Sequence, residues 1–277
     1  MEHISLTIFS ICVQAAIGIT IFVAIGRLVF KDKVFKNAMI VASGISVIGM
    51  IFSLLHLGHP LKAMYALLQF GSSWLSREIW FTAIFVGLTV LSTLIVLLKP
   101  EMKKLSNVLI YLTAIVGLID VFVMASIYST TSVSFWQGSA TYFEFYAATI
   151  SMGAACFLLL SMKESREMTK LLDVAITSVI IVQVVTVTLH LINAGTSSQP
   201  AMAGSLVILM SMPIINALKW ILLLAGTVLF VWLSTKELSK TVIRNAVVFS
   251  GCFIVFGQII GRYLFYAAMI APGIGLL

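Results

Sequence analysis

Long apolar runs alternate with short polar connections along the whole sequence. Each run approaches or exceeds the roughly 20 residues that a helix needs to cross a bilayer. The pattern therefore predicts an all-α integral membrane protein, built as a single polytopic domain over residues 1–277. Its eight transmembrane helices are expected over about residues 5–30, 38–56, 78–98, 106–128, 143–162, 171–194, 213–233 and 245–270.

Composition excludes a soluble domain. Hydrophobic residues make up 61% of the protein and charged residues 10%, and the mean hydropathy is +1.13. Soluble domains are about 25% charged. The net charge of +7 would suit nucleic acid, but its distribution follows the connections between spans. We therefore predict lipid contacts and no nucleic-acid partner.

The basic residues occupy alternate connections. The connections after the first, third, fifth and seventh runs hold 13 of the 17 lysines and arginines. They are Arg27, Lys31, Lys33, Lys36, Lys99, Lys103, Lys104, Lys163, Arg166, Lys170, Lys236, Lys240 and Arg244. By the positive-inside rule, both termini lie outside the cell. Residues 2–3 are Glu and His, so we also expect no cleaved signal peptide at this end.

A weak repeat relates the two halves of the sequence. The second and sixth runs both end in Leu-His-Leu, at His56 and at His190. Each of these runs is the second helix of a four-helix half. One arrangement that would explain the repeat is a pair of four-helix bundles.

The stretch Leu54–Glu78 is the longest interruption in the first half of the sequence. Pro60 suits the first position of a short helix and Gly71 suits its end, which predicts a helix lying on the outer leaflet. Ser73 or Ser76 is expected to cap the third span. Glu78 then falls in the first turn of that span, where the helix dipole favours an anion.

Ionisable and amide side chains gather near the outer ends of the predicted spans, and the inner halves hold few of them. The outer set is His56, Arg77, Glu78, Asp120, Glu144, His190, Asn193, Asn216, Lys219 and Arg262. Because intramembrane charges are costly and usually functional, this distribution predicts a one-sided site. Structural roles are also open: Arg262 can pair with Glu78, and Lys219 or Arg262 can neutralise Asp120. Lys219 can also snorkel, and Gln14, Gln183 and Gln258 can bond between helices.

Aromatic residues stand at the edges of the outer connections, which cover about residues 57–77, 129–142 and 195–212. They are Trp74, Tyr128, Trp136, Tyr142 and Trp220. Such residues often form an interfacial belt. The outer connections also offer a surface on which a soluble partner can dock.

A histidine, carboxylates and an arginine at one depth suit the oxidation of a quinol. The reaction releases two protons, which a neutral histidine and a carboxylate can accept, while a cation stabilises the anionic quinol oxygen. Cys12, Cys156 and Cys252 stand alone in apolar runs, without a cluster-binding or haem-attachment spacing. Electrons must therefore leave for a redox centre in another subunit.

Three segments carry a resemblance to a known family. The segments LLHLGHPLKAMYAL and GSSWLSREI, with GQIIGRYLFYAAMIAPGIGL near the C-terminus, resemble the membrane anchor subunit of dimethyl sulfoxide reductase, the DmsC family. The resemblance implies a multi-pass anchor of the bacterial cytoplasmic membrane. It implies that a four-cluster iron–sulfur subunit and a molybdopterin catalytic subunit dock on its outer face, and that the anchor itself binds no haem, iron–sulfur cluster or other metal.

The resemblance further implies that the protein binds and oxidises menaquinol. In the family, the residues that match His56 and Glu78 are implicated in this reaction. We predict His56 and Glu78 as the catalytic pair. The predicted quinol-binding set is His56, Pro60, Arg77, Glu78, Asp120 and Arg262.

Three other interpretations are open from the sequence. His56 and His190 can ligate one haem b in a quinol-oxidising anchor. A secondary transporter would need polar groups at the midplane, where only Asp120, Gln183 and Gln258 come close. A purely structural anchor, with quinol bound elsewhere, is the third.

Overall fold

A computed structural model describes residues 2–30, 32–55, 67–162, 164, 166–235 and 240–270. Within these residues the regular structure is entirely helical. The long helices are α1 (Glu2–Val29), α2 (Lys36–Leu55), α4 (Trp74–Leu98), α5 (Lys103–Ser129), α6 (Ser139–Leu160), α7 (Thr169–Thr196), α9 (Pro213–Thr235) and α10 (Lys240–Ala267). The short elements are η2 (Ser134–Trp136), η3 (Arg166–Met168) and α8 (Pro200–Met210).

The eight long helices are the eight predicted spans. Each has the length and hydropathy to cross a membrane, and each observed boundary lies within a few residues of the predicted one. Most of the helices run a few residues beyond the predicted apolar windows. The protein is therefore a multi-pass membrane protein.

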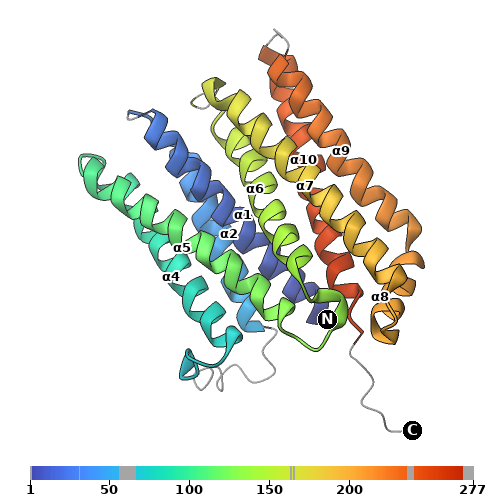
Figure 1. Cartoon of the computed structure of the whole chain (residues 1–277). Coiled ribbons are helices and arrows are strands. Elements are labelled where there is room, and N and C mark those ends of the chain that lie inside the picture. The colour runs from blue at the N-terminus through green and yellow to red at the C-terminus, as the bar shows by residue number, and fades with distance from the viewer. Residues whose placement is uncertain are drawn as a thin grey trace.

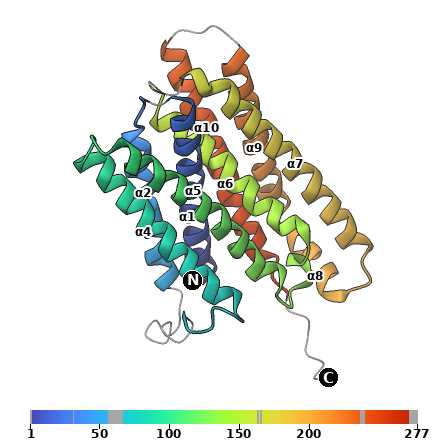
Figure 2. The ribbon, with the colours of Figure 1, turned by 60° about the vertical axis from the view of Figure 1, so that its left-hand side comes forward.

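Helix α1 is the centre of the assembly. It contacts α2, α5, α6 and α10, and Figure 2 shows it in the middle of the helices. Of its most apolar window 72% is buried, against 17% for α7, so α7 presents most of its surface to lipid. Since α1 contacts helices from both halves of the sequence, the division into two four-helix bundles stays a prediction.

The crossing of α1 and α6 is unusually close. A Cβ atom on Gly18 would overlap the carbonyl oxygen of Thr149 and lie 2.7 Å from the Cα of Gly153. A Cβ on Gly153 would overlap the backbone of Gly18 in turn. Small residues at such crossings let transmembrane backbones touch, and this contact holds the two halves of the protein together.

The two ends of the bundle differ in character. The start of α1, the end of α10, α8 and η2 all lie at one end (Figure 1). Lys33, Lys99 and Lys103 lie in or beside connections at the opposite end. The predicted outer connection 195–212 contains α8, which we did not predict, although Pro200 at its first position is a recognised start signal.

Candidate functional site

Two buried carboxylates from neighbouring helices lie close together near the end of the bundle that carries the start of α1. Ser73 caps α4, its side chain accepting from the backbone N–H of Ser76, as predicted. The cap starts the helix so that Glu78 points inward, where it is 7% exposed. Asp120 of α5 is fully buried and close enough to Glu78 for the two to interact electrostatically.

The two carboxylates differ in their hydrogen bonds. The hydroxyl of Thr82, one turn after Glu78, lies 3.1 Å from each carboxylate oxygen of Asp120. Glu78 Oε1 is buried and has no hydrogen-bond partner among the described residues. An unsatisfied buried polar atom costs about 1–3 kcal/mol, so we expect Glu78 to bond to a group outside the described residues, from the protein or from a ligand.

A tyrosine pair and stacked rings form the next layer. The hydroxyls of Tyr128 (α5) and Tyr266 (α10) are 3.0 Å apart, and both tyrosines interact electrostatically with Glu78. The Trp136 ring stacks on Phe265 with centroids 5.2 Å apart, and its indole N–H donates to the Phe265 carbonyl at 2.8 Å. We predicted Tyr128 and Trp136 among the belt residues, but Trp136 is buried, with 5% exposed, and Tyr128 is half-buried against it.

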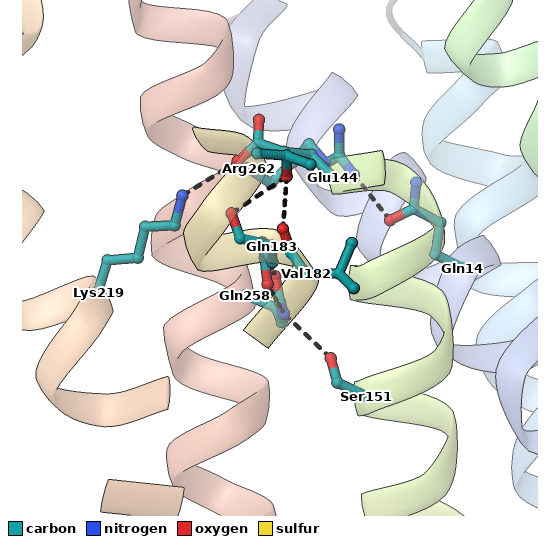
Figure 3. A network of polar contacts seen from close by, with 9 residues as sticks. Gln14, Glu144, Ser151, Val182, Gln183, Lys219, Gln258 and Arg262 are labelled. Atoms are coloured by element: carbon teal, nitrogen blue, oxygen red, sulfur yellow. Dashed lines mark hydrogen bonds and ion pairs between the residues drawn. The ribbon is translucent and has the colours of Figure 1, made fainter. Parts of the chain in front are cut away.

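Arg262 lies deeper along α10, on the same face as Tyr266. Its guanidinium stands 3.7 Å from the centre of the Phe145 ring and donates from Nη2 to Gln14 Oε1 at 2.9 Å (Figure 3). The side chain is 4% exposed, and its Nε and Nη1 have no hydrogen-bond partner in the described part of the protein. The predicted pairing of Arg262 with Glu78 is therefore wrong: its bonded partner is a neutral amide.

Lys219 of α9 pairs with Glu144 of α6 through Nζ and Oε1, 3.1 Å apart (Figure 3). Lys219 is 5% exposed, so it does not snorkel to the surface. The expectation that Lys219 or Arg262 neutralises Asp120 is also wrong, since Asp120 is in none of the ion pairs between described residues. Lys219 pairs with Glu144 and Arg262 bonds to Gln14. The helices that carry Asp120 and Lys219 share no substantial contact. The positions of the two residues along the sequence do not show which helices are neighbours.

The predicted amide contacts between helices are confirmed. Gln183 and Gln258 exchange hydrogen bonds at 3.3 and 3.0 Å, and Gln258 also donates to the Ser151 hydroxyl at 3.0 Å. A cavity of about 10 Å³ lies between Glu144, Gln183, Gln258, Gly261, Arg262 and Phe265. This is room for about one water molecule, which can join the ion pair to the pair of amides.

Arg77 lies apart from these groups. It is half-buried, donates to the carbonyls of Phe70 and Gly71 at 2.9 and 2.8 Å, and stands 4.3 Å from the Trp74 ring. With Trp80, which donates to the Leu67 carbonyl, it holds the turn that leads into α4. His56 and Pro60, the other predicted members of the site, lie outside the described residues, as does most of the short helix predicted to start at Pro60 and end at Gly71.

His190 lies on the far side of the same end. Its Nε2 is 2.8 Å from the Phe135 carbonyl oxygen, and its ring contacts the Phe135 ring at 4.7 Å between centroids. It also lines an open pocket of about 450 Å³ between η2, α7 and α8. Within the described residues, no group of three His, Cys, Asp or Glu side chains forms a metal-ligand set.

Comparison with known proteins identifies the family of this chain. The model of the family described as "DMSO reductase anchor subunit (DmsC)" matches residues 1–268. The chain belongs to the DmsC family. The match includes every residue of the site described above, and the resemblance carried by the sequence motifs is confirmed.

Three relatives are similar over different shares of the sequence. The C subunit of the anaerobic dimethyl sulfoxide reductase of Haemophilus influenzae is 31% identical over 55% of this protein and 56% of its own length. The corresponding C subunit of the Escherichia coli enzyme is 28% identical over 83% of this protein and 80% of its own length. The YnfH subunit of an Escherichia coli anaerobic dimethyl sulfoxide reductase is 24% identical over 98% of this protein and 96% of its own length. No solved structure matches this sequence.

Several residues of the anchor's site are not among those predicted from the sequence. Tyr266 follows Arg262 by four positions, and Tyr128 follows Asp120 by eight, so each shares a helix face with a predicted residue. Such spacing could have identified both tyrosines as members of the site from the sequence. Thr82 likewise follows Glu78 by four positions. A lone threonine in an apolar helix usually bonds its own backbone, so only the structure reveals the contact between Thr82 and Asp120.

Proposed function

We propose that this anchor subunit holds a dimethyl sulfoxide reductase-type complex on the membrane and oxidises menaquinol for it. The complex would include a four-cluster iron–sulfur subunit and a molybdopterin catalytic subunit, docked on the outer face. The observation that carries the quinol site is the buried carboxylate Glu78, whose Oε1 lacks a hydrogen-bond partner among the described residues. A quinol hydroxyl is a donor that would satisfy it.

The chemistry can be assigned to the protein's own groups. Glu78 accepts the hydrogen bond and then the proton of one quinol hydroxyl. His56, which starts the connection before α4, takes the other proton in this proposal. Asp120 is held by Thr82 and interacts with Glu78, which makes it the next acceptor in a relay.

Arg262 and the tyrosines define the inner wall. Tyr128 and Tyr266 interact electrostatically with both Glu78 and the Arg262 guanidinium. Their paired hydroxyls can pass a proton or donate to a quinol oxygen. Arg262 provides positive charge beside them, which favours an anionic quinol or semiquinone oxygen. The stacked rings of Trp136 and Phe265 keep this wall dry.

Electrons leave through a partner in this proposal, because the sequence has no cysteine spacing that could hold a cluster. The outer face carries the connection before α4, η2 and α8, which together form the docking surface. Protons and electrons then leave on the same side, so that turnover is electroneutral.

The test is quinol oxidation by the assembled complex carrying Glu78→Gln. Loss of a positioned proton acceptor lowers rates by about 10²–10⁴-fold, so we expect a fall of at least about 100-fold in electron flow from a reduced naphthoquinone to the acceptor. Electron flow from a soluble reduced dye, which donates electrons directly to the catalytic subunits, should not change. Glu101→Gln, an exposed carboxylate at the opposite end, is the control. Normal quinol oxidation in an assembled Glu78→Gln complex would exclude the proposed role.

A further inference from the structure

A second polar feature lies at the opposite, lysine-rich end of the bundle. A cleft opens between the end of α1, the connection to α2 and the turn between α4 and α5. Charged and hydroxyl side chains line it: Arg27, Asp32, Lys33, Lys99, Lys103 and Ser106. None of them belongs to the site that contains Glu78.

Arg27 forms the floor of this cleft. The side chain is 6% exposed. Its Nη1 donates to Ser106 Oγ at 2.8 Å and to Asn107 Oδ1 at 2.9 Å, and its Nη2 donates to the Val34 carbonyl at 2.9 Å. These acceptors are all neutral, and Nε is buried without a partner among the described residues.

The charge on Arg27 is therefore held in place but not neutralised. None of the salt bridges between described residues includes it. A buried charge without a counter-ion is expensive, and a guanidinium with a spare N–H is well suited to a phosphate oxygen. Because Arg27 lines the cleft, an anion bound there would neutralise its charge.

The surrounding charges reinforce this preference. Lys33, Lys99 and Lys103 lie at the rim, and the rim carboxylate Asp32 has a side chain 96% exposed and 3.9 Å from Lys103. Glu167 lies 3.4 Å from Lys33 with its own side chain 69% exposed. Exposed pairs of this kind hold their charges weakly, so the cleft keeps an excess of positive charge.

The position of the cleft identifies the source of the anion. Arg27 lies in the last turn of a candidate span that ends at Val29, and Lys99 directly follows one that ends at Leu98. Both therefore stand at the depth of lipid head groups. Basic pockets between transmembrane helices at this depth bind anionic lipid head groups.

We propose that this cleft binds the phosphate of an anionic phospholipid. Arg27 faces the phosphate oxygens from below, and Lys99 and Lys103 hold them from the rim. The cleft volume of about 30 Å³ equals about two water molecules. It therefore admits the inward-facing oxygens of one phosphate, while the glycerol and the acyl tails lie outside along α4 and α5.

The test uses the full-length protein in a zwitterionic detergent, with dihexanoyl phosphatidylglycerol as the probe. The probe should raise the thermal unfolding temperature in a saturable manner, and dihexanoyl phosphatidylcholine should not. Arg27→Gln removes the floor but also removes three structural hydrogen bonds, so the decisive variant is the surface pair Lys99→Gln with Lys103→Gln. We expect this pair to bind phosphatidylglycerol roughly tenfold more weakly, because each lysine at the membrane surface adds to the attraction.

The control is Lys36→Gln with Lys104→Gln. These residues are exposed, lie at the same end and do not line the cleft, so the variant removes the same charge from the same surface. Equal weakening in both double variants would overturn the site in favour of a general surface potential. A matching shift with inorganic phosphate alone, at the same concentration, would overturn the lipid as the source.

Discussion

The charged side chains in the interior of this protein have three different kinds of surroundings. Glu144 and Lys219 neutralise each other directly. Arg262 is surrounded by rings and amides. Glu78 and Asp120 share a compartment without a cation bonded to them among the described residues. We expect the first arrangement to serve stability, and in our proposal the last provides proton acceptors for a ligand.

The Glu144–Lys219 pair can be tested by a double-mutant cycle. Lys219→Met leaves the half-buried Glu144 without its partner. Removing one member of a buried pair costs about 3–5 kcal/mol, and because the Glu144 side chain is 19% exposed we expect a loss of up to about 3 kcal/mol. The double variant Lys219→Met with Glu144→Gln should recover most of that loss, because no uncompensated charge remains. Thermal unfolding of the detergent-purified protein measures both effects.

An exposed pair supplies the control for this cycle. Glu167→Gln breaks the contact with Lys33 and should change stability by less than about 1 kcal/mol. If Lys219→Met were as mild as Glu167→Gln, the Glu144–Lys219 bridge would not be a buried structural pair.

At the scale of elements, the decisive feature is the α1–α6 crossing. Gly18 and Gly153 permit backbone contact, and this contact sets the separation of the helices that carry Gln14 and Glu144. Since Arg262 contacts Gln14 from α10, a change in the crossing would also displace the polar interior.

Gly18→Ala is expected to destabilise the protein by about 3 kcal/mol or more, the upper range for overpacking, because a backbone carbonyl and not a flexible side chain occupies the space for its Cβ. Thermal unfolding and the yield of monodisperse protein report the effect. Gly87→Ala, on an open helix surface with nothing near its Cβ, is the control and should be neutral or stabilising by up to about 1 kcal/mol. Equal stability of the two variants would contradict the close crossing.

At the scale of the whole molecule, the helices expose apolar side chains over most of their length. On α7, the side chains of Val174, Ile181, Val185 and Leu189 are 64%, 58%, 50% and 60% exposed. This outward apolar surface suits lipid. The gathering of 13 of the 17 lysines and arginines in the connections at one end predicts the orientation in the membrane.

Fusion reporters test this orientation. We expect alkaline phosphatase, which is active only outside the cytoplasm, to be active when fused after Leu277 and inactive when fused within the α4–α5 turn at Glu101. A green fluorescent protein should give the reverse pattern. Activity of the phosphatase at Glu101 would place the lysine-rich end outside and reverse the predicted topology.

The linear pattern of residues determined the spans, the basic connections, the Ser73 cap and the place of Glu78 in the first turns of α4, because hydropathy and capping are local properties of the sequence. It also predicted that polar side chains would gather at one end. The choice of partners was decided by tertiary structure alone. Arg262 meets Gln14 and Lys219 meets Glu144 because helix rotation and the glycine crossing place those faces together. Several rotations of an apolar helix bury its few polar groups equally well, so only the packed bundle selects one.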